Sequence, residues 1–156
     1  RLPDRLQIGQ LGAAEGSRFR GQRLSHGVVP GRAGLGLQIL VTAGPVRFTG
    51  DLTPADGGLD VGPNPHDLVA AGLAACTTQT LRLYARRKAW ALGAVHVEVT
   101  WRRDPSSQPA DLFERTITLS GDLDDAQRAR LMEIAEACPV HKMLVAGSRV
   151  VTSVAA

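Results

Sequence analysis

The sequence is poor in aromatic residues, in cysteine and in long apolar runs. Phe, Tyr and Trp make up 4% of its 156 residues, which leaves little aromatic surface for stacking nucleic-acid bases. No run reaches about 18 consecutive apolar residues, the length that spans a bilayer as a helix. The formal net charge is only +3, and no basic run is interleaved with aromatic residues. We therefore expect neither nucleic acid nor a membrane as a partner.

Only two cysteines are present, Cys76 and Cys138. This number is too small for a disulfide-rich secreted scaffold, and no signal peptide can be read, so we predict a reducing, cytoplasmic environment. In such an environment a pair of thiols is inert, metal-bound or redox-active. The length predicts one domain with a sizeable core, and we assign residues 1–20 to an irregular arm and 21–156 to that domain.

A long helix is predicted around Cys76. Pro65 suits its first turn, where a backbone N–H is not needed, and Asn64 is the expected N-cap. Asp67 lies in the first turn, at the positive end of the helix dipole. The half of the helix before Cys76 is apolar on nearly every side, which predicts burial on every side, and Gly72 leaves room for another element to approach closely.

The remaining patterns predict an α+β fold with a mainly antiparallel sheet. Alternating apolar residues predict strands at 35–41, from Val46, and at 95–101 and 113–120, with further strands at 22–29 and 150–154. Asp124 and Gln127 form the sequence pattern of a capping box, and the helix that follows is expected to end at Cys138, because Pro139 disfavours helical geometry there. Residues 140–146 are expected to form a short helix.

Burial of the central helix predicts a homodimer. A sheet of about six short strands covers one side of that helix. The other side needs a second layer, and no segment of the chain remains to supply it. Packing the central helices of two copies together would bury both of them.

The two cysteines are expected to differ in reactivity. The thiolate is the nucleophile, and burial in the middle of a helix raises the pKa of the Cys76 thiol, so an Arg or His must be brought to it. Cys138 is expected at a helix C-terminus, where the negative end of the helix dipole disfavours a thiolate. This asymmetry makes Cys76 the attacking thiol and Cys138 the resolving one. An equally weighted reading treats both as small buried hydrophobic residues.

A zinc site is the alternative for the same residues. Cys138 and His141 have C-x2-H spacing, and Cys76 and His66 would complete four ligands. Structural zinc sites usually use denser paired motifs, so we predict no metal. His141 is then a local hydrogen-bonding residue near Cys138.

Several segments together resemble the OsmC/Ohr family of osmotically induced and organic hydroperoxide resistance proteins. Residues 51–58 and 62–68 resemble the glycine-rich loop and helix start of that family, and residues 70–76 and 80–88 resemble its central helix with the first cysteine. Residues 138–142, read Cys-Pro-Val-His-Lys, are similar to the second-cysteine motif of one branch.

The resemblance implies an intertwined homodimer whose central helices are wrapped by sheets from both chains. It implies that Cys76 reduces organic hydroperoxides, that Cys138 resolves the sulfenic acid as a disulfide, and that a dithiol such as lipoamide resets the pair, with no cofactor. An arginine from the early strands supports the first thiolate in the family. Arg32 is our first choice for it, and Arg18, Arg20, Arg23 and Arg47 remain alternatives.

The sequence departs from the family where a glutamate is expected ten residues before the first cysteine. His66 occupies that position, and a neutral imidazole cannot pair with arginine as a carboxylate does. Asp67 is the nearest substitute carboxylate, although His66 as an ordinary exposed first-turn residue fits equally well. We assign Asp67 and Gly72 to the substrate site. The sequence therefore predicts a thiol-dependent peroxidase, with a weakly catalytic protein that binds a small apolar or electrophilic ligand as the alternative.

Overall fold

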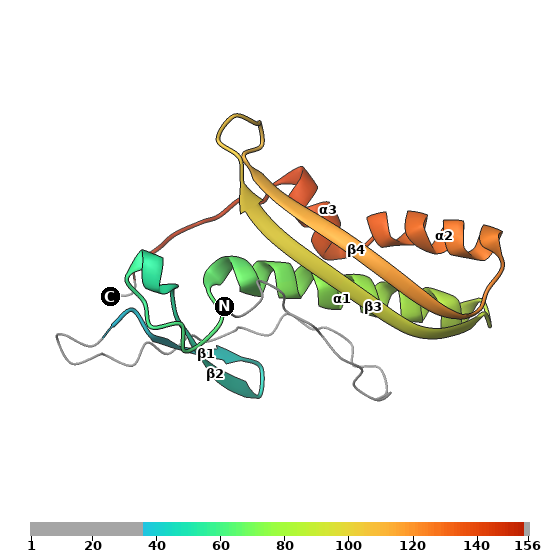
Figure 1. Ribbon diagram of the computed structural model, residues 1–156, viewed down its shortest axis with the longest axis horizontal. Helices are drawn as coiled ribbons and strands as arrows, with labels where there is room; N and C mark the ends of the chain where they lie inside the picture. The colour runs from blue at the N-terminus through green and yellow to red at the C-terminus, as the bar shows by residue number, and fades with distance from the viewer. Residues whose placement is uncertain (1–35, 155–156) are drawn as a thin grey trace. The chain divides into compact units, whose positions relative to one another are not determined.

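The computed structural model describes residues 36–154 and shows an α+β fold with antiparallel strands, as predicted. Its elements are β1 (Ile39–Ala43), β2 (Val46–Gly50), the 3-10 turn η1 (Pro54–Asp56), α1 (Pro65–Arg87), β3 (Ala91–Arg103), β4 (Asp111–Asp122), α2 (Asp125–Glu136) and α3 (Pro139–Ala146) (Figure 1). The arm at 1–20 and the strand predicted at 22–29 lie outside the described residues. No helix between residues 36 and 154 is long and apolar enough to cross a membrane.

The described chain forms two compact units, one up to Val69 and one from Ala70 onward. In the first, β1 and β2 form an antiparallel hairpin that turns between Ala43 and Val46. The strand predicted at 35–41 starts later than expected, at Ile39, and Leu37 before it is 49% exposed. The loop predicted between β2 and the long helix is confirmed, with η1 inside it.

Asp51 organises this loop with a carboxylate that is only 3% exposed. Its oxygens accept hydrogen bonds from the backbone N–H groups of Leu52 at 2.8 Å, Leu59 at 2.9 Å and Val61 at 3.3 Å. The side-chain amide of Gln38 donates a fourth, at 3.3 Å. Burial alone would raise the pKa of Asp51, but these donors outweigh it and hold the pKa below its ordinary value.

The start of α1 is capped as the sequence predicts. Asn64 Oδ1 accepts from the backbone N–H of His66 at 2.9 Å and of Asp67 at 3.0 Å. Asp67 Oδ2 in turn accepts from the backbone N–H of Asn64 at 3.2 Å. Pro65 is the first helical residue, where its missing N–H costs nothing.

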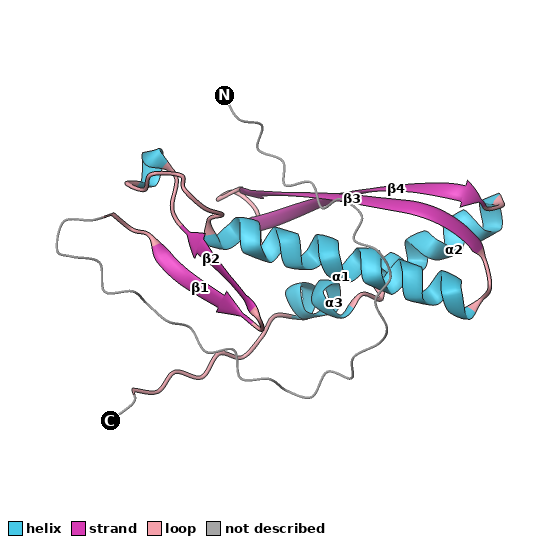
Figure 2. Cartoon of the chain, turned by 90° about the horizontal axis from the view of Figure 1, so that it is seen from below, coloured by secondary structure: helices cyan, strands magenta, loops and turns pink. Residues whose placement is uncertain are grey.

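In the second unit, the antiparallel β3–β4 hairpin runs along α1, with α2 and α3 packed beside it (Figure 2). The inward residues of β3, Val95, Val97 and Val99, are buried, as their alternation predicts. Leu81 of α1 and Leu131 of α2 are fully buried against them. This core positions both cysteines, because Cys138 belongs to it and Cys76 packs at its edge.

Two predictions about the strands are wrong. Residues 150–154 form no strand, and Val150 is 83% exposed, because no described strand pairs with that segment. The described residues hold four strands in two separate hairpins instead of one sheet of about six. The expectation that this chain leaves part of the long helix uncovered agrees with Leu83 of α1, which is 39% exposed.

The connection between α2 and α3 also differs from expectation. The capping box of Asp124 and Gln127 is confirmed, with Asp124 Oδ1 accepting from the Gln127 N–H at 2.7 Å. However, α2 ends at Glu136, and Cys138 is the N-cap residue of α3. Pro139 explains this result, because a proline that cannot continue one helix is suited to the first position of the next.

Candidate functional site: the Cys76–Cys138 thiol pair

The thiols of Cys76 and Cys138 lie in hydrogen-bonding contact with each other. Both cysteines are free. Cys76 projects from the middle of α1 and is half-buried, whereas Cys138, in the bend between α2 and α3, is fully enclosed, at 0% exposure. The structure therefore brings together the two residues that the sequence singled out, and gives them unequal access to solvent.

The surroundings of Cys138 favour its thiolate. Burial raises the pKa of this thiol, but hydrogen bonds from the Cys76 thiol, the His141 N–H, the Thr77 hydroxyl and the Val140 N–H more than offset it, so the pKa is lowered. The N–H donors belong to the first turn of α3, where the helix dipole also favours negative charge. The prediction that Cys138 lies at a helix C-terminus, with a disfavoured thiolate, is thus wrong.

Cys76 shifts in the opposite direction. Burial and the hydrogen bond and negative charge of Cys138 raise the pKa of Cys76. The Val140 N–H and the Thr80 hydroxyl oppose this rise without reversing it. Because the two thiols interact, their protons leave in two steps that belong to the pair and not to either residue alone.

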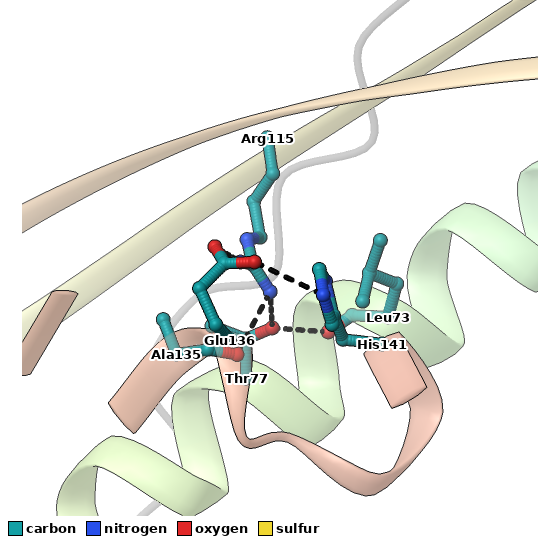
Figure 3. A network of polar contacts seen from close by, with 6 residues as sticks. All are labelled: Leu73, Thr77, Arg115, Ala135, Glu136 and His141. Atoms are coloured by element: carbon teal, nitrogen blue, oxygen red, sulfur yellow. Dashed lines mark hydrogen bonds and ion pairs between the residues drawn. The ribbon is translucent and has the colours of Figure 1, made fainter. Parts of the chain in front are cut away.

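Arg115 of β4 reaches toward Thr77 on α1 and toward the end of α2, which carries Ala135 and Glu136 (Figure 3). Its side chain is only 9% exposed. Nη1 donates to Thr77 Oγ1 at 2.9 Å and to the Ala135 carbonyl oxygen at 3.2 Å, and Nη2 donates to Glu136 Oε1 at 2.7 Å. One guanidinium therefore connects β4, α1 and the end of α2 next to the buried thiol.

Two further contacts complete this network. His141 Nε2 lies 3.0 Å from Glu136 Oε2, so the His141 ring faces a carboxylate two residues before Cys138 in the sequence. The Thr77 hydroxyl donates to the Leu73 carbonyl oxygen at 2.8 Å, one turn earlier on α1, and Thr77 is fully buried. Thr77 thus contacts an arginine and a helix carbonyl through one oxygen atom, and its hydroxyl is one of the groups that lower the pKa of Cys138.

Sequence reasoning missed Arg115, although the sequence carries a signal for it. Phe113, Ile117 and Leu119 are the partly buried, inward positions of β4, and Arg115 occupies the same alternating register. A charged residue at an inward position needs a buried partner, because an unpaired buried charge is costly. That signal pointed to a polar site beneath the sheet.

The other predicted site residues have no described contact with this network or fall outside the described residues. Arg32 and the alternatives Arg18, Arg20 and Arg23 fall outside the described residues. Arg47 lies on β2 and is exposed.

His66 and Asp67 form the first turn of α1, within the unit that ends at Val69. Gly72 is exposed, and a Cβ placed on it would meet no atom within 4 Å, so no described element of this chain makes the close approach expected there.

The zinc arrangement considered from the sequence does not form among residues 36–154. No group of three or more His, Cys, Asp and Glu side chains in that range is placed to hold a metal ion. His141 is directed to Glu136 instead.

A cavity of about 310 Å³ lies at the far end of α1, away from both thiols. It is lined by Arg82, Ala85, Arg86, Trp90, Leu92 and Gly93. Trp90 therefore does line a cavity, and neither cysteine lines this one. We therefore take the thiol pair, and not this cavity, as the candidate functional site.

Comparison with known proteins gives a consistent result. The family model for OsmC-like proteins matches residues 56–153. No curated protein sequence matches the chain. Among solved structures, a protein of Psychrobacter arcticus, described as an osmotic stress induced and detoxification response protein, is similar with a TM-score of 0.63 and 22% identity, covering 80% of this chain and 89% of that one.

Two further similar structures are described as organic hydroperoxide resistance proteins. One, from Legionella pneumophila, has a TM-score of 0.51 and 24% identity over 69% of this chain and 80% of that one. The other, from Vibrio cholerae, has a TM-score of 0.53 and 25% identity over 72% and 79%, and holds a captopril molecule in one of its active sites.

Proposed function

The chain belongs to the OsmC-like protein family, and we propose that it is a thiol-dependent peroxidase that reduces organic hydroperoxides through Cys76 and Cys138. The observation that carries this proposal is the contact between a half-buried thiol and an enclosed one. The similarity to a protein of Vibrio cholerae described as an organic hydroperoxide resistance protein supports the choice of substrate. The pair can therefore form a disulfide without a large movement of the chain.

In the first step, the Cys76 sulfur attacks the outer oxygen of the hydroperoxide. The O–O bond breaks, a sulfenic acid forms on Cys76, and the departing alkoxide takes a proton to become an alcohol. Only Cys76 offers partial access from solvent, since Cys138 is fully enclosed. Cys138, whose pKa is lowered, acts as the base that accepts the Cys76 proton through their hydrogen bond.

In the second step, the Cys138 sulfur attacks the sulfenic sulfur of Cys76. The S–S bond forms as the S–O bond breaks, and the hydroxide leaves as water after taking a proton. A dithiol such as lipoamide then reduces the disulfide and is itself oxidised. Net, one hydroperoxide and one dithiol become one alcohol, one water and one disulfide.

A cation near Cys76 would move negative charge from Cys138 to Cys76 and speed the first step. Arg32 remains our proposal for this residue. We also keep His66 as a catalytic candidate and Asp67 as a substrate-binding one, since all three belong to the part of the sequence that precedes Cys76.

We further propose that the protein works as a homodimer packed along α1. Gly72, Cys76, Gln79 and Leu83 follow one another at spacings of four, three and four residues, so they form one face of the helix. Gly72 and Gln79 on this face are exposed, and Leu83 is 39% exposed. A second copy of α1 packed on this face would form one wall of an apolar substrate site beside Cys76 that stays open to solvent, with Gly72 allowing close approach.

The test is mass spectrometry of the reduced protein after one equivalent of cumene hydroperoxide. We expect the loss of two hydrogens, located to a Cys76–Cys138 disulfide, in the wild type and not in Cys76→Ser. Thiols that stay fully reduced would contradict the proposal. They would favour a protein that binds a small apolar or electrophilic ligand, a candidate supported by the pKa of Cys76, which burial raises.

A further inference from the structure

We propose that Arg115 and Thr77 control the ionisation of Cys138: Arg115 positions the Thr77 hydroxyl so that it donates its proton to the Cys138 sulfur whenever that sulfur carries negative charge. This inference rests on the proposed function, because it gives the resolving thiol of that reaction its supporting residues. Thr77 contacts a reacting sulfur directly, and Arg115 is a positioning residue that acts through it.

The Thr77 hydroxyl has a single proton to donate. While Cys138 is a neutral thiol, that proton is donated to the Leu73 carbonyl oxygen, 2.8 Å away. The Cys138 sulfur is a second acceptor within hydrogen-bonding reach. A thiolate is a far better acceptor than a backbone carbonyl that already serves a helix, so ionisation of Cys138 redirects the proton to sulfur.

Arg115 prepares the hydroxyl for this role. Its Nη1 donates to Thr77 Oγ1 at 2.9 Å and so occupies a lone pair of the oxygen. A charged donor on the oxygen polarises the hydroxyl and strengthens the hydrogen bond that its own proton makes. Because Thr77 is fully buried, water cannot replace either partner.

The same guanidinium also holds the segment that carries Cys138. Its bonds to the Ala135 carbonyl oxygen and to Glu136 Oε1 fix the end of α2, within three residues of the thiol. Figure 3 shows these contacts converging on Arg115 from α1 and α2. Loss of Arg115 would therefore free both the Thr77 hydroxyl and the segment between α2 and α3 that carries Cys138.

The titratable and charged groups around Cys138 come from every element that surrounds it: Cys76 on α1, Arg115 on β4, Glu136 on α2 and His141 on α3. Glu136 contacts both Arg115 and His141, at 2.7 and 3.0 Å, so its negative charge offsets the field of the arginine. Arg115 then influences Cys138 mainly through the Thr77 hydroxyl that it positions. Substitution of Thr77 is therefore the more direct test of the proposal.

The first experiment titrates Cys138 by the ultraviolet absorbance of its thiolate in the Cys76→Ser protein, where a hydroxyl replaces the neighbouring donor. Adding Thr77→Val, which removes the hydroxyl at similar size, should raise the pKa of Cys138 by about one unit, a tenfold change in its acid dissociation constant. Adding Thr77→Ser, which keeps the hydroxyl, should leave the titration near that of the parent. Equal titrations for Val and Ser would overturn the proposal.

Arg115 is tested in the same background. Arg115→Gln should raise the pKa of Cys138, as Thr77→Val does. Arg115→Lys keeps the charge and one donor, so its Cys138 pKa should fall between those of the parent protein and Arg115→Gln. Arg128→Gln is the matched control, because among the described residues Arg128 donates to the carbonyl oxygens of Leu119, Gly121 and Leu123 and not to Thr77. A shift in Arg128→Gln as large as that in Arg115→Gln would also overturn the proposal.

The second experiment uses the protein with both cysteines and follows disulfide formation after one equivalent of cumene hydroperoxide. Thr77→Val should slow the resolving step about tenfold near neutral pH, matching the titration, and Thr77→Ser should restore it. If the wild type forms no disulfide, the proposed function fails, but the titration still decides the role of Thr77 and Arg115. The two failures are therefore distinguishable.

Discussion

The thiol of Cys138 lies wholly inside the protein and against the thiol of Cys76, which is partly open to solvent. In the proposed reaction, a peroxide that approaches from solvent meets Cys76 first, because Cys138 is fully enclosed. The pKa of the enclosed thiol is lowered. In that reaction Cys138 therefore serves first as the base and then as the resolving nucleophile.

We predict that Cys138→Ser traps the first intermediate. Without the resolving thiol, the sulfenic acid formed on Cys76 has no neighbouring sulfur to attack it. Treatment with cumene hydroperoxide followed by dimedone should add one label, located to Cys76 by peptide mass spectrometry. Label on Cys138 in the reciprocal variant, Cys76→Ser, would reverse the assignment of the two roles.

A second prediction concerns self-association. If two copies pack along the face of α1 that holds Cys76, then Leu83→Glu places buried like charges in the interface and should shift the protein from dimer to monomer. Sedimentation velocity over a dilution series measures this shift. Met132→Glu is the control, because Met132 is 46% exposed on α2, outside that face. A wild type that stays monomeric at every concentration would refute the dimer.

Asp51 makes stability depend on pH in a defined direction. Its pKa is lowered below the ordinary value of 3.8, so its ionisation stabilises the folded chain above that pH, and the stabilisation is lost as pH falls through the lowered folded value. Asp51→Asn should lower the thermal unfolding midpoint near neutral pH. The difference from wild type should shrink in acid; a difference that is constant with pH would contradict this role.

The core between the β3–β4 hairpin and the helices predicts a large effect at Leu131. This side chain is fully buried, and Leu131→Ala removes it without a means of refilling the space. We expect a loss of about 2–5 kcal/mol in the free energy of unfolding, measured by urea denaturation. Met132→Ala, at the exposed neighbouring position, should change stability by less than about 0.5 kcal/mol. Similar losses for the two would contradict the described core.

Much of the local structure was predictable, because local signals determine it. Pro65 and the Asn64 cap mark the start of α1, and the pattern of Asp124 and Gln127 marks the start of α2. The alternation along β3 predicts which of its residues are buried. The strand expected at 150–154 failed because alternation describes a strand only when another strand is available to pair with it.

The site was predictable only in part. Both cysteines were identified from their sequence context, but the end of α2 was placed two residues too late, and that error inverted the expected acidity of Cys138. Arg115 was overlooked because its partners, Thr77 and Glu136, are far from it in sequence. Its inward register on β4 was the available clue.

The sequence by itself determined the α+β elements, the family and the identity of the two thiols, since these depend on periodicity, caps and motifs within short segments. The tertiary structure decided which thiol is enclosed, which thiol has the lowered pKa, and which arginine contacts Thr77 and the end of α2. Those properties depend on burial and on hydrogen bonds between α1, β4 and the bend before α3. Contacts of this kind arise only when segments distant along the chain are brought together by packing.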